Sequence, residues 1–252
     1  MRYAIFGDIH SNLESLISMY NTVACEVDKI ICTGDVVGYA AKPNECVEFL
    51  REYDINFVLG NWDYWCADEN TDCSTLRPNV QWTIAWTREQ LTQDNKDYIR
   101  QRPIIIEEKD FQVVHATLHK PRMFNYFGIA SPKKTKDILN DMIEHYKRMK
   151  FNISFIGHTH LPRVDVLDGN GLLFSEYLDD ELKIEESSKY VINVGSVGQS
   201  RNEIPKAFGI IYDSENRTIK EVQCDYDIEK TQQEILETKL SPKNAIRLEK
   251  GK

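Results

Sequence analysis

The sequence predicts an α/β (α+β) sandwich, in which two packed, mixed β-sheets are flanked by helices. Three observations support this prediction. The first third of the chain alternates short apolar runs with helical stretches, the second half is rich in strand-like segments, and polar residues recur where strands end. The resulting βαβαβ order implies parallel strands joined by right-handed crossovers. Continuous apolar runs are typical of strands that are covered on both faces.

The first sixty residues are expected to alternate strands and helices. These elements are Tyr3–Gly7, Asn12–Cys25, Lys29–Thr33, Asn44–Tyr53 and Asn56–Leu59. Ser11 and Glu14 have the spacing of a capping box at the start of the first helix. Asn12 has two possible roles, a helix cap or a contact to a substrate phosphate at the helix N-terminus, and the cap is slightly favoured.

A helical insertion is expected at about residues 62–102. Apolar side chains recur at helical spacing over Asn79–Gln93, which indicates an amphipathic helix. Trp82 and Trp86 are one turn apart and therefore share a face. Core packing is favoured over a base-stacking platform for this pair, although its position between motifs also allows it to roof an active site.

The second half of the chain is expected to supply a second sheet that packs on the first. Its predicted elements are the helix Lys133–Met149 and the strands Ile104–Glu107, Phe111–His115, Ile153–Gly157, Arg163–Leu167, Leu172–Tyr177, Tyr190–Val194, Ala207–Asp213 and Thr218–Cys224. A helical tail follows at about 228–252. Because no repeat or long linker interrupts the chain, we predict a single domain over residues 1–252.

Composition limits the classes of partner. The formal charge of −9 argues against broad binding to nucleic acid or to anionic membranes. A small anionic substrate stays possible, because bound divalent cations can dominate the electrostatic field of a site.

No membrane span and no signal peptide are expected. Six scattered cysteines without a CxxC pair predict reduced thiols in a cytoplasmic protein, with a Cys66–Cys73 disulfide as the minor alternative. The oligomeric state stays open.

Metal-ligand residue types recur at the carboxyl ends of the predicted strands, where ligands gather in α/β sheets. These residues are Asp8, His10, Asp35, Asn61, His115, His158 and His160. Carboxylate oxygen together with imidazole nitrogen suits Mn, Fe, Zn, Ni or Co. Seven ligands are too many for one tetrahedral ion, but they suit two divalent ions that share a carboxylate. Two ions about 3.5–4 Å apart can hold a bridging hydroxide and clamp a phosphoryl group.

The motifs Asp8-x-His10, Gly34-Asp35, Gly60-Asn61, His115 and Gly157-His158-x-His160 resemble, in order and spacing, those of the calcineurin-like metallophosphoesterase family. A later block, residues 193–202, is similar to a prokaryotic phosphodiesterase-like branch. The resemblance implies a dinuclear hydrolase in which a metal-bridging hydroxide attacks a phosphate ester. It assigns one metal to Asp8, His10, Asp35 and His160. It assigns the other to Asp35, Asn61, His115 and His158, so that Asp35 bridges the two ions.

The sequence departs from the family pattern at Trp62, where many relatives have a histidine that protonates the leaving group. An indole has no proton that titrates near neutral pH. The expected substrate is therefore a small phosphodiester or nucleotide-type ester rather than a simple alkyl monoester. His119 is the candidate substitute acid, although a surface loop histidine is favoured, and His145 is expected to be solvated.

Arg201 is the candidate for holding a phosphate oxygen bidentately, with support of a turn as an equal alternative. The predicted catalytic residues are thus Asp35, Asn61, His119 and Arg201, and the predicted substrate-binding residues are Asn12 and Arg201. Two alternative activities stay open, a protein phosphatase and a dinucleoside-polyphosphate hydrolase. A non-catalytic metal-binding scaffold is the alternative from another class, because the family resemblance includes a subunit that mainly binds partners.

Overall fold

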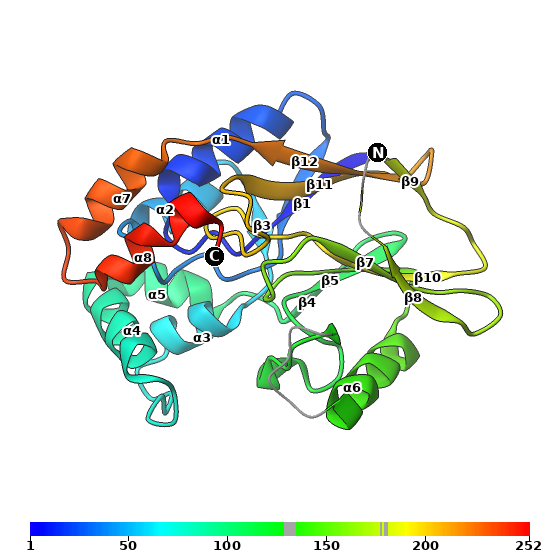
Figure 1. Ribbon diagram of the computed structural model, residues 1–252, viewed down its shortest axis with the longest axis horizontal. Coiled ribbons are helices and arrows are strands. Elements are labelled where there is room, and N and C mark those ends of the chain that lie inside the picture. The colour runs from blue at the N-terminus through cyan, green and yellow to red at the C-terminus, as the bar shows by residue number, and fades with distance from the viewer. Residues whose placement is uncertain (129–134, 177, 179–180) are drawn as a thin grey trace.

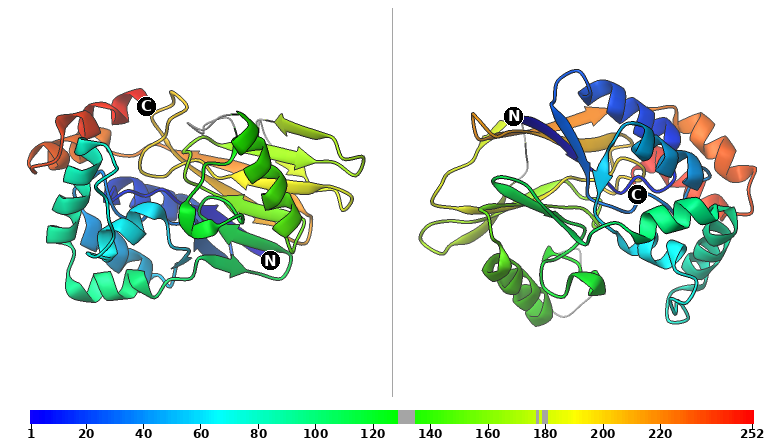
Figure 2. Two further views of the ribbon diagram at one scale, coloured as in Figure 1. Left: turned by 90° about the horizontal axis from the view of Figure 1, so that it is seen from below. Right: turned by 180° about the vertical axis from the view of Figure 1, so that it is seen from behind.

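The chain folds around two six-stranded mixed sheets that pack face to face (Figures 1 and 2). The computed structural model describes residues 1–128, 135–176, 178 and 181–252. In spatial order, the first sheet contains β3 (Asn56–Phe57), β2 (Lys29–Cys32), β1 (Arg2–Phe6), β11 (Ala207–Asp213), β12 (Thr218–Cys224) and β9 (Glu181–Lys183). The second contains β4 (Ile105–Glu107), β5 (Phe111–Val114), β6 (Ile153–Ile156), β10 (Lys189–Asn193), β7 (Arg163–Leu167) and β8 (Leu173–Glu176). The predicted fold class is therefore confirmed.

Parallel strands form part of each sheet. In the first sheet, β1 pairs in parallel with β2, and β2 with β3, as the βαβαβ pattern predicted. In the second sheet, β6 pairs in parallel with both β5 and β10. On the other side of β1 lies β11, which is antiparallel to it and comes from far along the chain. Because β1 and β2 run in the same direction, as do β5 and β6, the loops after them bring distant residues together.

Alternation along β1 shows how the sheets build the core. Tyr3 and Ile5 face the second sheet and belong to the cluster between the two sheets. Ala4 and Phe6 face the opposite way, into a cluster with the helices. All four side chains are buried, which is why the strand is a continuous apolar run and not an alternating one.

Helices cover the outer faces of both sheets (Figures 1 and 2). The first sheet is covered by α1 (Leu13–Val23), α2 (Pro43–Glu52), α3 (Asn61–Ala67) and α5 (Gln93–Arg100). The second is covered by α6 (Thr135–Arg148). The remaining helices are α4 (Pro78–Gln90), α7 (Ile228–Leu236) and α8 (Pro242–Ile246), with 3₁₀ turns η1 (Pro121–Met123) and η3 (Leu248–Lys250).

The region predicted as a helical insertion holds α3, α4 and α5. The predicted helix Asn79–Gln93 ends earlier, at Gln90, because Thr92 caps the next helix and accepts a hydrogen bond from the Asn95 N–H at 3.2 Å. Neither α3 nor β9 was predicted as a separate element. Each is short, at seven and three residues, too short for its periodicity to stand out from the neighbouring loops.

The two tryptophans of α4 contact the C-terminal tail and so join it to the insertion. Trp86 is buried in a cluster with Ile235 of α7 and Leu248 of η3. Trp82 is 53% exposed, and its indole N–H donates to the Lys239 carbonyl oxygen at 2.8 Å. The predicted core role is therefore right for Trp86 and wrong for Trp82, which lies at the edge of the tail.

The start of α1 differs from the predicted capping box. Asn12 is the cap, and its Oδ1 accepts a hydrogen bond from the Ser15 N–H at 3.2 Å. Ser11 instead accepts the Gly38 N–H at 3.0 Å, and so braces the loop after β2. The capping box was misassigned because Ser11 and Asn12 are both good caps and the register between them is set by tertiary contacts.

His145 was expected to be solvated, and this prediction is wrong. The side chain is fully buried under α6, where Nδ1 accepts the Leu118 N–H at 3.1 Å and Nε2 lies 3.1 Å from Ser154 Oγ. All six cysteines are free thiols, as expected. None of the helices in the described part of the chain has the length and apolar character that a membrane crossing requires.

Candidate metal centre

The predicted ligands lie on short loops at one edge of the two sheets, immediately after β1, β2, β5 and β6 and at the start of α3. Several have a left-handed backbone, with φ values of 50° at Asp8, 52° at His10, 55° at Asp35, 71° at His158 and 62° at His160. Residues with side chains seldom adopt this conformation, although Asp and His tolerate it better than most. Such strain is typical of functional sites, where the surrounding structure enforces it.

Asp8, His10 and His160 form the first group of buried ligand atoms. The two Nε2 atoms of His10 and His160 lie 3.0 Å apart. Asp8 Oδ1 lies 3.2 Å from His160 Nε2 and 3.8 Å from His10 Nε2. One ligand atom from each residue lies within 4.8 Å of the others, so the three side chains converge on a space suited to one ion.

Asp35, His115 and His158 form the second group. His115 Nε2 lies 3.3 Å from Asp35 Oδ2, 3.2 Å from His158 Nδ1 and 3.0 Å from the amide oxygen of Asn61. The same Asp35 Oδ2 atom also lies 3.8 Å from His10 Nε2 of the first group. Asp35 therefore stands between the two groups, where a bridging carboxylate belongs.

Backbone carbonyl groups fix the rings of three histidines. The Nδ1 atoms of His10, His115 and His160 lie 3.2, 2.8 and 2.5 Å from the carbonyl oxygens of Val37, Thr33 and Gln199. If each Nδ1 carries the proton and donates it, Nε2 keeps its lone pair. Metal-binding histidines in proteins are oriented in this way.

The donor set fits divalent transition metals. Asp8 Oδ1 and His158 Nε2 are buried without a hydrogen-bond partner, and such atoms are costly unless something else satisfies them. Mixed carboxylate and imidazole ligands suit Mn, Fe, Zn, Ni or Co. Asp8, His10, Asp35 and His160 would hold one ion, and Asp35, Asn61, His115 and His158 the other.

Burial and mutual charge shift the titration of these groups. Burial raises the pKa of Asp8, although His115 and His10 oppose it. Burial, and then His160, lower the pKa of His10 to about 3. Burial also disfavours a charged His115, but the charge and the hydrogen bond of Asp35, the charge of Asp8 and the Thr33 carbonyl together outweigh it and raise the pKa of His115 to about 9. His158 of the same group differs, because burial and then the charge of His115 lower its pKa.

Asp63 was not singled out from the sequence, yet it fixes the loop that carries Asp35. Its carboxylate accepts the N–H groups of Asp35 and Val36 at 2.8 Å, of Gly60 at 3.0 Å and of Val37 at 3.2 Å. The signal was its position two residues after Asn61, near the N-terminus of a helix, where an acidic side chain turns back to cap backbone amides. Asp63 thus joins the loops after β2 and β3.

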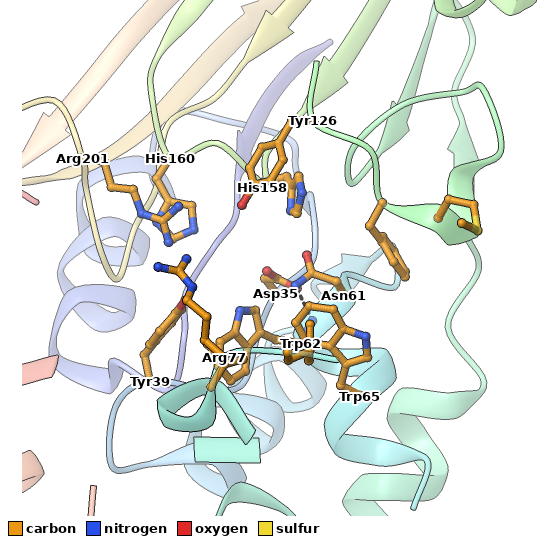
Figure 3. Close-up of a pocket in the computed structure, with 14 residues that line it drawn as sticks. Asp35, Tyr39, Asn61, Trp62, Trp65, Arg77, Tyr126, His158, His160 and Arg201 are labelled. Carbon is orange, nitrogen blue, oxygen red and sulfur yellow. Dashed lines mark hydrogen bonds between the residues drawn. The ribbon is translucent and has the colours of Figure 1, made fainter. Parts of the chain in front are cut away.

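A cavity of about 240 Å³ opens beside both groups (Figure 3). Trp62 forms part of its wall and is 3% exposed. Its ring packs edge-on against His10 at 5.9 Å between centroids and lies 4.3 Å from the ring of Tyr39. Gly38 permits this packing, because a Cβ atom there would lie 2.5 Å from the indole. Trp62 is therefore built into the wall.

Other wall residues were not predicted. Tyr126 stacks on His158, with 4.1 Å between the ring centroids, and Trp65 also lines the cavity. Arg77, at the N-cap of α4, directs its guanidinium into the pocket (Figure 3). These residues belong to no motif, so only the fold brings them to the site. Trp82 and Trp86, for which a roof over the site was the less favoured role, are absent from the lining residues, and the beginning of α4 lines the cavity instead.

The remaining predicted site residues divide in their placement. Arg201 lines the cavity, and its Nη2 donates to Gln199 Oε1 at 3.1 Å. Asn12 does not line it, because the amide nitrogen donates to the Gly198 carbonyl oxygen at 3.0 Å and the oxygen caps α1. His119 also lies outside the lining and approaches Asp141 of α6 at 4.0 Å. The chain turns toward α6 after β5, which carries His119 away from the metal ligands.

Comparison with known proteins agrees with this geometry. Residues 1–216 match the calcineurin-like phosphoesterase superfamily domain. The chain belongs to this superfamily. A calcineurin-like phosphoesterase is a hydrolase, so the predicted enzyme class is confirmed. The crystal structure of a metallophosphoesterase from Sphaerobacter thermophilus superposes with a TM-score of 0.84 at 29% identity, over 100% of this chain and 99% of that one.

Two further relatives of this calcineurin-like phosphoesterase were found by sequence. An uncharacterized protein of Methanocaldococcus jannaschii is 36% identical over 94% of this chain and 93% of its own length. A symmetrical bis(5'-nucleosyl)-tetraphosphatase of Actinobacillus pleuropneumoniae is 28% identical over 44% of this chain and 43% of its own length. The first relative extends the similarity over nearly the whole chain.

Proposed function

We propose that this chain uses two divalent metal ions to hydrolyse a phosphodiester or nucleotide-type phosphate ester. The observation that carries the proposal is the position of Asp35 Oδ2, 3.3 Å from His115 Nε2 and 3.8 Å from His10 Nε2. A single carboxylate oxygen is thus within reach of both ligand groups. Two ions sharing a carboxylate are the arrangement of many phosphate-cleaving enzymes.

The bound ions would supply positive charge to the phosphoryl oxygens and a water of lowered pKa as the nucleophile. The chain itself supplies orientation. Carbonyl oxygens of Val37, Thr33 and Gln199 hold the ligand rings. Arg201 lies in the cavity wall with a buried Nε that has no partner, so its guanidinium is available to a phosphate oxygen.

The wall residue Trp62 restricts the leaving group. Its indole cannot deliver a proton, and the described wall residues other than the ligands offer only tyrosine phenols, of Tyr39 and Tyr126, as possible acids in its place. His119 lies outside the lining residues. General acid catalysis is worth about 10²–10⁴-fold when a leaving group needs it. The favoured substrates are therefore those that leave as weakly basic anions, such as phenolates or phosphates.

A dinucleoside-polyphosphate hydrolase is the second candidate within the same chemistry. Partial similarity to a bis(5'-nucleosyl)-tetraphosphatase favours it, and the leaving group of such a substrate is itself a phosphate. A non-catalytic scaffold would retain the fold without a need for both ligand groups.

Metal analysis and a substrate panel test the proposal together. Purified protein should contain two equivalents of transition metal and, with Mn²⁺, Fe²⁺, Zn²⁺, Ni²⁺ or Co²⁺, should prefer aryl or nucleotide esters to alkyl monoesters. Asp35→Asn should lose metal and activity. Asp54→Asn is the matched control, because Asp54 is exposed and has a φ of 51°, which Asn also tolerates. Full activity in Asp35→Asn would exclude the bridge, and absence of both metal and hydrolysis would favour the scaffold.

A further inference from the structure

Three arginines from separate parts of the chain lie near one side of the cavity, and two of them, Arg77 and Arg201, line it. Arg77 comes from the start of α4, Arg201 from the loop after β10, and Arg247 from the tail beside η3. The Arg247 guanidinium lies 5.6 Å from the ring centroid of Tyr39, which is a wall residue. Figure 3 shows the guanidinium groups of Arg77 and Arg201 pointing toward one another, on the side of Tyr39 and His160.

None of these positive charges is paired with a carboxylate side chain of the described residues, although the Arg247 Nε donates a hydrogen bond to the Lys252 carbonyl oxygen. Burial and then the charge of Arg201 lower the pKa of Arg247, and Arg77 adds to this effect. The Nε of Arg201 is buried without a partner. Like charges held together in this way repel one another unless an anion lies between them.

The arginines lie on the side of the first ligand group. The backbone N–H of Arg201 donates to the His160 carbonyl oxygen at 3.3 Å. Aromatic rings border both groups, because Tyr39 and Trp62 pack on His10 at 4.8 and 5.9 Å between centroids, and Phe124 and Tyr126 pack on His115 and His158 at 6.0 and 4.1 Å. Among the lining residues, the arginines lie on the side of the first group, and the side of the second group, called the aromatic side below, has aromatic rings without an arginine.

We propose that Arg77, Arg201 and Arg247 form a subsite for a second phosphate group, joined directly to the phosphate that is cleaved. This inference rests on the proposed function, which places the scissile phosphate at the two ligand groups. The substrate class is then an ester with two or more consecutive phosphates, and its planar organic group lies on the aromatic side. The superfamily match ends at residue 216, so Arg247 is outside it.

The reaction balances without a protein acid. Water adds to the phosphorus held at the ligand groups, and the bond from that phosphorus to the bridging oxygen breaks. The bridging oxygen keeps the electron pair and departs on the second phosphate, while the protons of water pass to the products and solvent. The leaving phosphate is weakly basic, which suits a site where Trp62 stands in place of an acid.

Binding tests the subsite without reference to catalysis. The full chain, kept in chelator so that metals do not hold the probe, is titrated with inorganic tripolyphosphate by calorimetry. Arg77→Gln and Arg247→Gln should each weaken binding about 10-fold or more, as expected for loss of a hydrogen bond between charged groups. Arg148→Gln, on the exposed face of α6, is the matched control and should bind like the wild type. Equal affinity in all four proteins, or no binding by the wild type, would overturn the proposal.

Kinetics of the metal-loaded enzyme supply the second test. The values of kcat/KM for bis(p-nitrophenyl) phosphate and for a nucleoside oligophosphate are compared in each variant. Arg77→Gln should lower the ratio of oligophosphate to diester about 10-fold, and Arg148→Gln should leave that ratio unchanged. An unchanged ratio in Arg77→Gln overturns the second subsite, even if the diester is hydrolysed. Failure to hydrolyse either substrate would instead refute the proposed function, and the calorimetric result would then decide the subsite by itself.

Discussion

The buried His145 should make the stability of the fold depend on pH in a defined window. Burial lowers the pKa of this side chain from 6.5 to about 3. In the unfolded chain the imidazole regains its ordinary pKa, so between these values the unfolded state binds a proton that the folded state does not. Stability is therefore unaffected above pH 6.5 and falls as the pH drops below it, by about 1.4 kcal/mol per pH unit. From pH 6.5 to 4.5 this group removes about 2.3 kcal/mol.

His145→Asn isolates that contribution, because Asn does not titrate and its Oδ1 can accept the Leu118 N–H. Urea unfolding in chelator at several pH values should show the wild type losing about 2.3 kcal/mol more than the variant between pH 6.5 and 4.5. Ser154→Ala removes the other contact of the imidazole but keeps its titration, so its curve should run parallel to the wild type. Parallel curves for wild type and His145→Asn would refute the argument.

Two substitutions test the assignments at the edge of the site. Asn12→Ala should lower the free energy of unfolding by about 1–2 kcal/mol, the usual cost of losing a helix cap, and should leave KM unchanged. An increased KM in a variant of unchanged stability would show that Asn12 contacts the substrate. Trp62→His should raise kcat/KM for an alkyl monoester about 10-fold or more relative to an aryl ester, because an imidazole can protonate the leaving group. The same ratio in both proteins would show that the missing acid does not limit the choice of substrate.

Local sequence patterns were sufficient to predict most strands and the loops that carry the ligand residues. The apolar runs that became β1, β2, β5 and β6 are short and continuous, and each ends one to three positions before a ligand residue. This juxtaposition of strand end and ligand type is a local property, and it is visible without knowledge of the fold. The pairing of β1 with β11 is not local, since about two hundred residues separate them, so no pattern in either strand specifies the neighbour.

Two histidines outside the candidate metal centre show the same limit of prediction from local sequence. His145 lies among charged residues in the sequence, yet α6 turns this position toward β6 and buries it beside Ser154. His119 is only four residues from His115, but the chain leaves β5 toward Asp141 of α6. Spacing along the sequence therefore fails where a loop reverses direction. The same is true of Arg77 and Tyr126, which reach the cavity through the insertion and a long loop.

Two features of the cavity wall, Trp62 and the arginines, have complementary consequences for the choice of leaving group. Under the proposed function, a tryptophan in place of an acid would disfavour leaving groups that need a proton, while arginines without carboxylate partners among the described residues would favour a substrate that carries further negative charge. A phosphate leaving group would satisfy both conditions, because it departs without a proton and the guanidinium groups would neutralise its charge. The burial of Trp62 against Tyr39 and Gly38 and the stacking of Arg247 on that same Tyr39 join these features in one wall. Selectivity for the leaving group would then be a property of this wall, and the metal ligands alone would not determine it.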